Sequence, residues 1–322
     1  MRSQLFNVLT VLILLYVPNL NFGQVPDLGA ASDFALFTVT GAFGNTGAST
    51  ISGDIGSNSE NVIGFPPGVV VGTIHNPPDG TTALAATAVA SAYVYLSGIT
   101  CGTVLGTPFG NGQTLVPDVY CLTTASTLNG ELILDGGDDP NALFIFKING
   151  ALSTNSSSKI TLINKASLCN VYWQIGGQLE LDDGSVFRGT ALVNGAIHLL
   201  GNSSLLGRGL SKAGAISTSN NVVRFLPDAA GSIIGNTTVC QGENAEIYTV
   251  PIIADAATYS WILPIGAIGT SSTNSITVNY GTSAISGNIT VKGNNSCGSD
   301  GAISTLAITV NTLPTASTIY HK

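Results

Sequence analysis

Three similar units follow one another between residues 178 and 226, and this repeat limits the possible folds more than any other feature. The units read QLELDDGSVFRGTALVNG, AIHLLGNSSLLGRGLSKAG and AISTSNNVVRF, at a spacing of about 19 residues. Each combines alternating apolar residues with a small polar corner. A unit this short cannot bury its apolar face alone, so we expect the units to stack on one another as the coils of a solenoid.

Similar alternating runs occur earlier in the chain, over residues 27–72 and 120–177. Turns rich in Gly and Asn separate these runs, which is typical of further coils. Residues 99–120 are rich in glycine and are predicted to form an irregular excursion. Two or three short coils are marginal alone, so all of the coils are predicted to stack into one solenoid domain over residues 24–227.

The segment 81–97 is the one helix that the sequence predicts in this domain. Its alanine content favours a helix, and Asp79, Thr81 or Thr82 can cap its start. Gly98 is well placed to end it. Both faces of this helix are small or apolar, so we expect it to lie along the side of the solenoid. The predicted fold class is therefore mainly β, with one inserted helix.

The composition favours an extracellular β-protein. Charged residues make up 9% of the chain, and 10 basic residues against 18 acidic ones give a net charge of −8. Gly is common, at 39 residues, and Ser, Thr and Asn fill most of the polar positions. Nucleic-acid binding is not expected, because neutralising phosphates requires clustered Lys and Arg.

Residues 1–23 have the pattern of a secretory signal peptide. Arg2 supplies the positive charge, residues 5–17 form the apolar core, and Pro18 ends that core. The core is too short to span a membrane comfortably as a helix, which needs about 20 residues. We therefore expect export, an extracellular or cell-surface location, and no membrane contact beyond export.

Export allows disulfides to form among the five cysteines. Cys101 and Cys121 flank the glycine-rich segment and are predicted to pair. Cys240 and Cys297 bracket the C-terminal β region and are predicted to form a second bridge. Cys169 lies in an apolar, strand-like run and is expected to remain a buried thiol. No Cys-x-x-Cys spacing occurs, so no zinc site is expected.

The repeat stops at the sequence PDAAGS, and residues 228–235 are predicted to form a linker. The segment 236–312 is rich in Thr, Ile and Val, with turn signals about every 8–12 residues, which predicts a small β-sandwich. Residues 313–322 are predicted to be a further linker or a tail.

Residues 28–226 resemble the DUF3494-like ice-binding family of microbial secreted proteins. The matching stretches occur in order along the chain: LGAASDFAL at Leu28, NTGASTISGDIG at Asn45, GFPPGVVVGTIH at Gly64, the Ala-rich helix, DPNALFIFKI at Asp139, CNVYWQIGG at Cys169 and LLGRGLSKAGAIS at Leu205. The resemblance implies a right-handed β-solenoid of triangular section with one long helix alongside. It also implies a secreted antifreeze protein whose partner is the ice surface.

Residues 236–312 are similar to PKD-like and immunoglobulin-like modules of secreted Bacteroidetes proteins. The similarity lies in TVCQGE, YSWILP and ITVKGNNSCGSD. It implies a spacer, or a tether to the cell surface.

Ice binding requires a rigid surface of short side chains that carry both a hydroxyl and a methyl group. Stacked strands repeat about every 4.7–4.9 Å, comparable to the repeats of ice, and Thr has few side-chain rotamers to lose. The resemblance implies Thr-Ala/Gly-x-Thr/Asn tetrads at one corner of successive coils. On this chain the candidate ice-binding residues are Thr46, Ser49, Thr154, Ser156, Ser157, Ser203, Ser204 and Asn220.

Other readings of the same residues remain open. These Ser, Thr and Asn residues also suit plain turns at solenoid corners. A neighbouring face is the second candidate, with Thr38, Thr40, Thr50, Ser52 and Thr161. Glu131 and Asp183 would place charge on the proposed corner. They motivate an alternative function, a cell-surface adhesin or matrix-structural protein that uses the solenoid to bind a polymer.

Catalysis, metal binding and cofactors are not predicted. Asp135, Asp138 and Asp139 resemble a calcium loop, but they lack the EF-hand spacing and suit a turn. The sequence does not place Arg188 or Arg208 beside this loop, as a polysaccharide lyase would require. Structural roles are also expected for His75 and His198.

Overall fold

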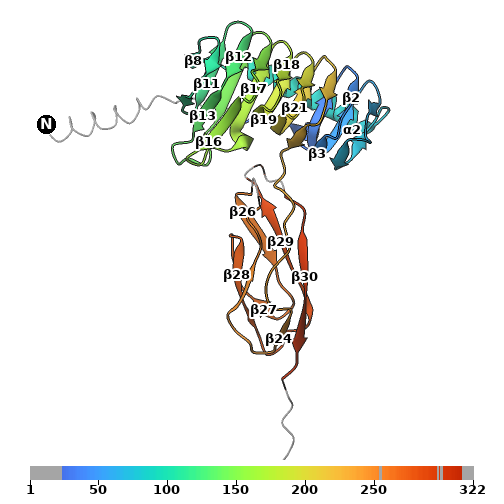
Figure 1. The fold of residues 1–322 in the computed structure, drawn as a ribbon, viewed down its shortest axis with the longest axis vertical. Helices are drawn as coiled ribbons and strands as arrows, with labels where there is room; N and C mark the ends of the chain where they lie inside the picture. The colour runs from blue at the N-terminus through green and yellow to red at the C-terminus, as the bar shows by residue number, and fades with distance from the viewer. Residues whose placement is uncertain (1–23, 254–255, 296, 298–299, 314–322) are drawn as a thin grey trace, which may run out of the picture.

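The computed structural model describes residues 24–253, 256–295, 297 and 300–313. Residues 34–224 form a three-sided stack of parallel strands with a long helix alongside, and a second β-rich unit, the C-terminal module, hangs below this stack (Figure 1). The predicted β-solenoid with one long helix is confirmed. The expected signal peptide lies in residues 1–23, outside the described part of the chain.

The first side of the solenoid, which we call the helix face, carries the long helix. In stacking order its strands are β8 (Thr103–Val104), β11 (Asp118–Leu122), β14 (Phe144–Ile148), β17 (Val171–Ile175), the second halves of β19 (Val186–Val193) and β21 (Ser204–Ser211), β1 (Phe34–Thr38), β4 (Asp54–Ser57) and β7 (Ile74–His75).

The second side, which we call the module face, is turned toward the C-terminal module. Its strands are β10 (Gln113–Leu115), β13 (Glu131–Asp135), β16 (Lys159–Ile163), the first halves of β19 and β21, β23 (Val222–Arg224), β3 (Thr50–Ser52) and β6 (Val69–Val71). Gly189 and Gly207 let β19 and β21 bend from one side to the next. A side chain at Gly207 would lie 1.9 Å from the Gly189 carbonyl oxygen, so only glycine fits there.

The third side is a separate eight-stranded parallel sheet, which we call the open face. Its strands, in stacking order, are β9 (Phe109–Gly110), β12 (Ser126–Asn129), β15 (Leu152–Thr154), β18 (Leu179–Leu181), β20 (Ile197–Leu199), β22 (Ile216–Thr218), β2 (Phe43–Asn45) and β5 (Val62–Ile63). The labels of β12, β18 and β2 lie along the upper side of the solenoid, opposite the module (Figure 1).

The coils before and after the helix form one body, as the sequence predicts. Strand β1 pairs with β21, β2 with β22 and β3 with β23, so the last coil of the solenoid stacks on the first. In the most regular part Val186 pairs with Ser204 and Ser204 with Val222, a period of 18 residues. The segment expected to be irregular, residues 99–120, instead supplies β8, β9 and β10 and so forms a terminal coil.

The helix α2 (Gly80–Gly98) carries the chain back along the stack. Its 19 residues span about 28 Å, close to six strand spacings. The Asp79 side chain accepts a hydrogen bond from the Thr81 amide, so Asp79 is the N-cap. The helix buries one stripe against the solenoid: Thr82, Ala85, Val89, Ala92 and Leu96. No helix among the described residues is long and apolar enough to cross a membrane.

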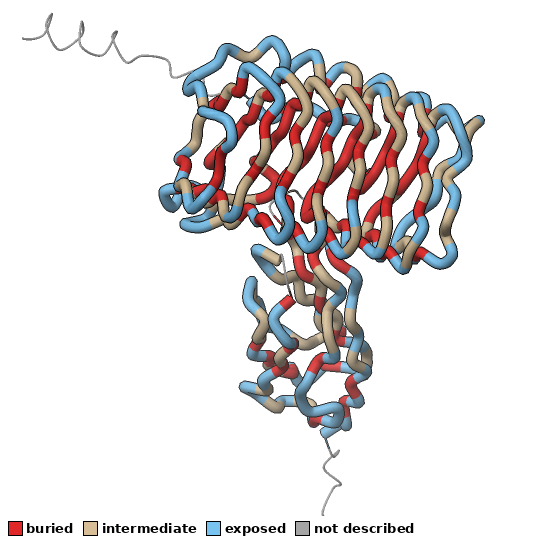
Figure 2. The backbone as a smooth tube through the Cα atoms, turned by 45° about the horizontal axis from the view of Figure 1, so that its top comes forward, coloured by how far each residue is buried: buried red, intermediate tan, exposed pale blue. Residues whose placement is uncertain are grey.

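The solenoid core is a column of inward-facing side chains. The buried residues that supply it recur in successive coils of the stack (Figure 2). Trp173 is fully buried and stacks on Phe146, with ring centroids 3.9 Å apart and an interplanar angle of 10°. Tyr120 stacks on the other side of Phe146, and Phe187 packs on Trp173. These residues come from four successive coils, so the stack ties the coils together. Two short 3₁₀ turns flank the body, η1 (Gly29–Ala31) and η2 (Leu168–Asn170).

The C-terminal module has two small sheets. One contains β24 (Thr238–Cys240), β30 (Ser304–Asn311), β29 (Gly287–Asn294) and β26 (Thr258–Ile262), and the other contains β25 (Glu246–Thr249), β28 (Ser275–Tyr280) and β27 (Ala267–Ile268). Their inner faces share one core. Within it the Tyr248 and Tyr280 hydroxyls lie 2.8 Å apart. Ile233, from the segment expected to be a linker, is buried in the same core.

The disulfides are Cys101–Cys121, as predicted, and Cys169–Cys297, which is not the predicted pair. The predicted Cys240–Cys297 bridge is wrong, and Cys240 is an exposed free thiol. Cys240 pairs in register with Asn311 at the end of β30, whereas Cys297 precedes the start of that strand. The length of β30 separates them by about 23 Å. Cys169 is not a free thiol, because it joins the solenoid to the module.

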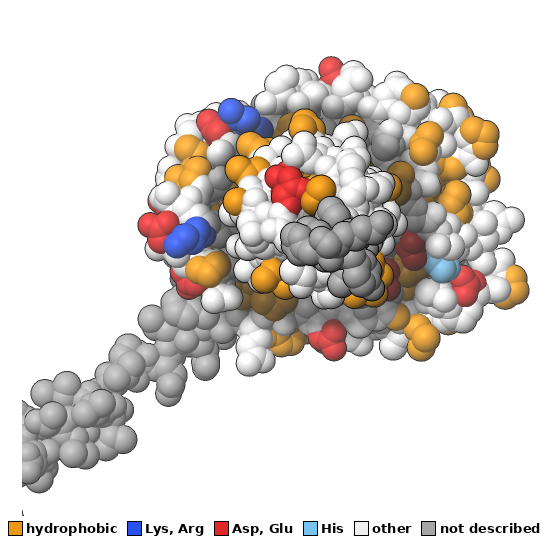
Figure 3. Space-filling view, turned by 90° about the horizontal axis from the view of Figure 1, so that it is seen from below, with side chains coloured by type: hydrophobic (Ala, Val, Ile, Leu, Met, Phe, Trp, Pro, Cys, Tyr) orange, Lys and Arg blue, Asp and Glu red, His pale blue; other side chains and the backbone are white. Residues whose placement is uncertain are grey.

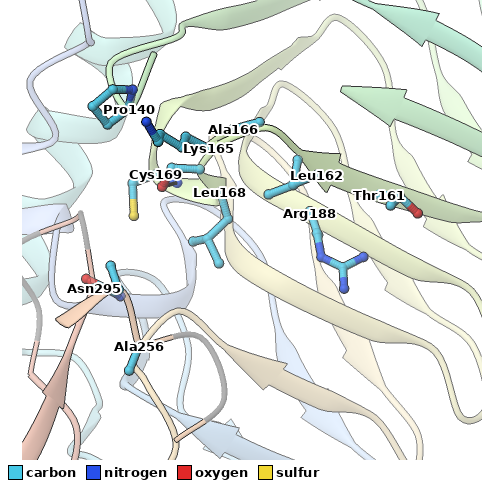
Figure 4. Close-up of a pocket in the computed structure, with 12 residues that line it drawn as sticks. Pro140, Thr161, Leu162, Lys165, Ala166, Leu168, Cys169, Arg188, Ala256 and Asn295 are labelled. Carbon is cyan, nitrogen blue, oxygen red and sulfur yellow. Dashed lines mark hydrogen bonds between the residues drawn. The ribbon is translucent and has the colours of Figure 1, made fainter. Parts of the chain in front are cut away.

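The module packs directly against the solenoid around this bridge. The Asn295 side-chain amide donates to the Phe225 carbonyl oxygen over 2.6 Å. A cleft of about 510 Å³ lies beside the bridge, with Thr161, Leu162 and Arg188 on the solenoid side and Ala256, Ala257 and Asn295 on the module side. In Figure 4, Cys169 lies on the solenoid side of this cleft, across from Asn295.

Candidate functional site

The three sides of the solenoid differ in what they leave accessible. The helix face is covered by α2, which packs on Phe37, Ile145, Tyr172 and other side chains of that face. The module face carries charged side chains, namely Glu131, Lys159, Arg188 and Arg224. Among the described residues, neither the helix nor the module lies over the open face. The open face is therefore the candidate surface for an extended, uncharged ligand.

The open face presents a central row of outward residues, one from each strand except β9. Inward and outward residues alternate, so the middle residue of each short strand points to solvent while its neighbours enter the core. In stacking order from β12, the row reads Thr127, Ser153, Glu180, His198, Ser217, Gly44 and Ile63. Most of these side chains are short.

A second outward row lies two residues earlier, immediately before each strand, and consists mainly of alanine. Successive backbone hydrogen bonds hold this row in register, from the Ser126 amide to the Ala151 carbonyl oxygen and onward along the stack. The row contains Ala125, Ala151, Gln178, Ala196, Ala215 and Ala42. Eight strands at about 4.8 Å spacing make the face about 33 Å long.

Hydrogen bonds between neighbouring strands orient parts of the central row. The Thr127 and Ser153 hydroxyls lie 3.0 Å apart, and the His198 Nδ1 lies 2.8 Å from the Ser217 Oγ. At the edge of the face, the Ser156 hydroxyl donates to Asp182 over 2.8 Å. The Asp183 amide and this hydroxyl hold the pKa of Asp182 below its usual value. Asp182 therefore stays ionised near neutral pH.

The structure places the predicted ice-binding residues at the corner between the open face and the module face, and it divides them. Thr46, Ser156, Ser157 and Asn220 are exposed, and Ser204 is half-buried. Ser49, Thr154 and Ser203 are buried, with at most 4% of their surface exposed. These three cannot contact ice, and their assignment to an ice-binding surface is wrong.

The buried corner residues bind the backbone and one another. The Thr154 hydroxyl accepts from the Asp182 amide over 2.8 Å. Ser49 accepts from the Asn221 amide, and Ser203 from the Asn221 side chain. Each coil must turn sharply here, and inward polar side chains satisfy backbone groups that the turn leaves unpaired.

The backbone conformation at this corner explains why some of its exposed residues are polar. Residues with left-handed backbone conformation stack there, with φ between 57° and 65°: Gly130, Ser157, Gly184, Asn202 and Asn220. Glycine and asparagine adopt this conformation most easily. Ser157 and Asn220 therefore have a turn-forming role, whatever else they contact.

The second candidate face is not a continuous surface. Thr38 is fully buried, whereas Thr40 and Thr50 are exposed and Ser52 and Thr161 are half-buried. Thr161 donates to Glu131, and this hydrogen bond and Lys159 hold the pKa of Glu131 below its usual value. A carboxylate paired with a lysine lies beside Thr161 on this surface.

Sequence reasoning missed the central row itself. Its signal is a short motif that recurs in five of the coils, an alanine followed by an inward residue, an outward residue and another inward residue: ASTL at 125, ALST at 151, AIHL at 196, AIST at 215 and AFGN at 42. The third residue of each motif points outward. The motif is visible in the sequence, but its register becomes clear only when the coils are aligned on their inward residues.

The residues considered for metal binding or catalysis have structural partners. Asp135 accepts from the Gly137 amide and the Asn164 side chain, which lowers its pKa and fits a turn. Arg208 is buried over the Phe225 ring, 3.8 Å from its centroid, and burial lowers its pKa to about 10. In the described part of the chain, no three His, Cys, Asp or Glu side chains are grouped to hold a metal ion.

His75 has a role that the sequence did not reveal. Its Nδ1 lies 2.7 Å from Asp79 and its Nε2 3.1 Å from Asp54. It joins the helix N-cap to strand β4 of the solenoid. The sequence placed Asp79 only four residues away, but the solenoid fold was needed to bring in Asp54.

Seen from the side of the module, the molecule has few charged side chains, and they are scattered (Figure 3). The Lys and Arg side chains visible in this view form no continuous patch.

Comparisons with known proteins agree with this architecture. Residues 37–224 match the family described as Ice-binding-like, and residues 226–308 match the PKD-like domain. An ice-binding protein of Nostoc sp. (strain HG1) is 38% identical over 202 residues, covering 61% of this chain and 72% of that protein.

Solved structures give the same result. An ice-binding protein from an Antarctic Flavobacteriaceae bacterium is similar with a TM-score of 0.61 and 38% identity, covering 69% of this chain and 55% of that one. One from the Antarctic ascomycete Antarctomyces psychrotrophicus has a TM-score of 0.60 and 32% identity, covering 62% of this chain and 98% of that one.

Proposed function

The chain belongs to the Ice-binding-like family, and from this premise we propose that it is a secreted protein that adsorbs to ice through the open face. Adsorbed protein inhibits crystal growth or recrystallisation. The observation that carries this proposal is the open face itself, an eight-stranded parallel sheet with outward rows of mostly Ala, Ser, Thr and Gly.

The physical argument rests on how such a surface orders water. Methyl groups of the alanine row cannot hydrogen-bond and leave water to bond with itself, while hydroxyls of the central row anchor it at intervals. Both rows repeat at the strand spacing of about 4.8 Å. Backbone hydrogen bonds fix the rows before ice arrives, so little conformational entropy is lost on adsorption.

The position of the module supports the same proposal. The module lies on the opposite side of the solenoid from the open face (Figure 1). A protein attached to a surface through the module would therefore leave the open face accessible, and cell-surface tethering is compatible with ice adsorption.

A tyrosine substitution in the central row tests the proposal. We expect the wild-type protein to show thermal hysteresis and to slow recrystallisation, and Ser217→Tyr to lose most of both effects because the ring holds the sheet away from ice. Thr114→Tyr is the matched control, since Thr114 is exposed on the module face. Circular dichroism checks that both variants fold.

The competing function is polymer adhesion, which the acidic residues Glu180 and Asp182 on the open face favour. The test is binding of the wild-type protein to polysaccharide beads. If the protein binds the beads but neither shapes ice nor slows its recrystallisation, its function is polymer adhesion and not ice adsorption.

A further inference from the structure

One strand interrupts the small-residue rows of the open face. Strand β18 presents Gln178, Glu180 and Asp182 on the outward side. The residues at the first two positions are Ala151 and Ser153 on one neighbouring strand, and Ala196 and His198 on the other. The side chains of β18 are longer and more strongly hydrated than the alanines and serines of the rows. They form a polar ridge across the middle of the sheet.

The surface on one side of this ridge is recessed. A hollow of about 630 Å³ lies over β12 and β15. Thr107 and Pro108 border it at the end of the stack, and Gln178 and Glu180 border it at the ridge. Its floor includes Ala125, Thr127, Ala151 and Ser153. A planar crystal surface that rests on the ridge cannot also reach this floor.

The other side of the ridge contains β20, β22, β2 and β5. Its alanine row is uninterrupted through Ala196, Ala215 and Ala42. Its central row continues from the His198–Ser217 hydrogen bond through Gly44 to Ile63. This half lacks long acidic side chains in either row, so it can meet a plane directly.

We propose that the ridge formed by Gln178 and Glu180 divides the open face, so that ice contacts the sheet mainly through the half containing β20, β22, β2 and β5. This inference rests on the proposed ice-binding function and names the residues that limit it. The Glu180 carboxylate orders water around its charge in a geometry that ice does not share. Asp182 is also acidic, but it lies at the edge and is engaged by Ser156.

Removing the ridge tests the inference. In the full chain, the double variant Gln178→Ala, Glu180→Thr extends both rows across the sheet and leaves Asp182 and its partners in place. Threonine suits a strand. Thermal hysteresis at equal concentration is expected to rise about twofold or more, because the contact area about doubles from four strands to eight. Glu246→Thr removes the same charge from a strand of the module and is expected to leave hysteresis unchanged.

A coupling measurement makes the test specific. In the native background, Ser153→Tyr is expected to lower hysteresis less than Ser217→Tyr does. In the Gln178→Ala, Glu180→Thr background the two tyrosines are expected to cost equally, because both halves now touch ice. Melting temperatures and circular dichroism show which variants are folded. If the double variant does not fold, the single variant Glu180→Ser, which keeps Gln178, replaces it in the same measurements.

The outcomes separate this inference from the proposed function. A wild-type protein without hysteresis or recrystallisation inhibition contradicts the proposed function. An active wild type whose hysteresis is unchanged or lowered by removal of the ridge overturns the inference alone. Equal losses of thermal hysteresis from Ser153→Tyr and Ser217→Tyr in the native background also overturn the inference alone.

Discussion

The bridge between Cys169 and Cys297 leads to a quantitative prediction about how the two parts of the chain are held together. One cysteine belongs to η2 on the side of the solenoid and the other to the loop after β29 of the module. The perturbation is the double variant Cys169→Ser, Cys297→Ser, which removes the bridge without leaving an unpaired thiol. The cores of the solenoid and the module are otherwise unchanged.

The size of the effect follows from the length of chain that the bridge closes. Its sequence separation is 128 residues, for which the loss of chain entropy in the unfolded state corresponds to about 5 kcal/mol. If the module unfolds while the solenoid stays folded, the relevant loop runs from Phe225 to Cys297, about 72 residues, and the value is about 4.4 kcal/mol. Both routes therefore give about 4 to 5 kcal/mol.

Calorimetry can detect a change of this size. In a unit as small as the module, 1 kcal/mol corresponds to about 4–8 °C, so its unfolding transition is expected to fall by at least about 15 °C. Cys240→Ser is the matched control, because Cys240 is exposed and unpaired, and it is expected to leave the transition in place. Peptide mapping without reductant should recover residues 169 and 297 in one linked fragment.

Two results would refute this reasoning. One is an unchanged module transition in the double variant. The other is a linked fragment that contains Cys240 instead of Cys169, which would restore the pairing expected from sequence position.

Two further predictions concern the stability of the solenoid. Trp173→Ala is expected to lower the free energy of unfolding by about 3–5 kcal/mol. Trp173→Phe keeps the stack on Phe146 but loses the 2.9 Å hydrogen bond to the Arg188 carbonyl oxygen, so it should lower the same free energy by about 1–3 kcal/mol. Urea denaturation measures both values, and equal losses of stability would contradict the stacking account. Burial alone would lower the pKa of His75, but the hydrogen bonds that its ring donates to Asp79 and Asp54 outweigh burial and raise it. This contact therefore stabilises the fold fully below the unfolded value of 6.5 and is lost as pH rises through the raised folded value. The melting temperature should fall across that range in the wild type and change less in His75→Gln, and identical pH profiles would show that the contact contributes nothing.

The sequence was sufficient to predict the solenoid, the helix and their union in one body. Its repeats are too short to fold singly, so they had to stack, and the Ala-rich segment had to lie along the stack. The sequence could not identify the stripe that the helix buries. Small and apolar residues occur on all sides of α2, so Leu84 is exposed while Ala85, Val89 and Ala92 are buried.

The site was harder to predict than the fold, for a reason visible at the corner. Ser, Thr and Asn occur there both inside and outside, because a sharp turn needs inward hydroxyls and amides for its backbone as well as polar residues toward solvent. Thr154 and Ser156 lie two residues apart, yet one binds the Asp182 amide and the other the Asp182 side chain. A shift of one residue in register exchanges the two sides of a strand. Only the aligned coils show that the extended surface lies on the strands and not on the corner.

The cysteine pairing failed for a similar reason. Sequence position brackets Cys240 and Cys297 within one module, but β30 holds them at opposite ends of it. The contact between the module and the solenoid, which brings Cys297 to Cys169, has no local signal in the chain.

The most direct test of ice adsorption through the open face is partitioning of the protein into a slowly growing ice crystal, compared between wild type, Gly44→Ala and Gly44→Tyr. Gly44 lies in the central row, and a side-chain carbon added there would meet only the Ile63 side chain, at 3.7 Å, so both variants should fold. Wild type and Gly44→Ala are predicted to enter the ice, and Gly44→Tyr to remain in the liquid. Exclusion of the wild type, or entry of Gly44→Tyr to the same extent as the wild type, would contradict the account.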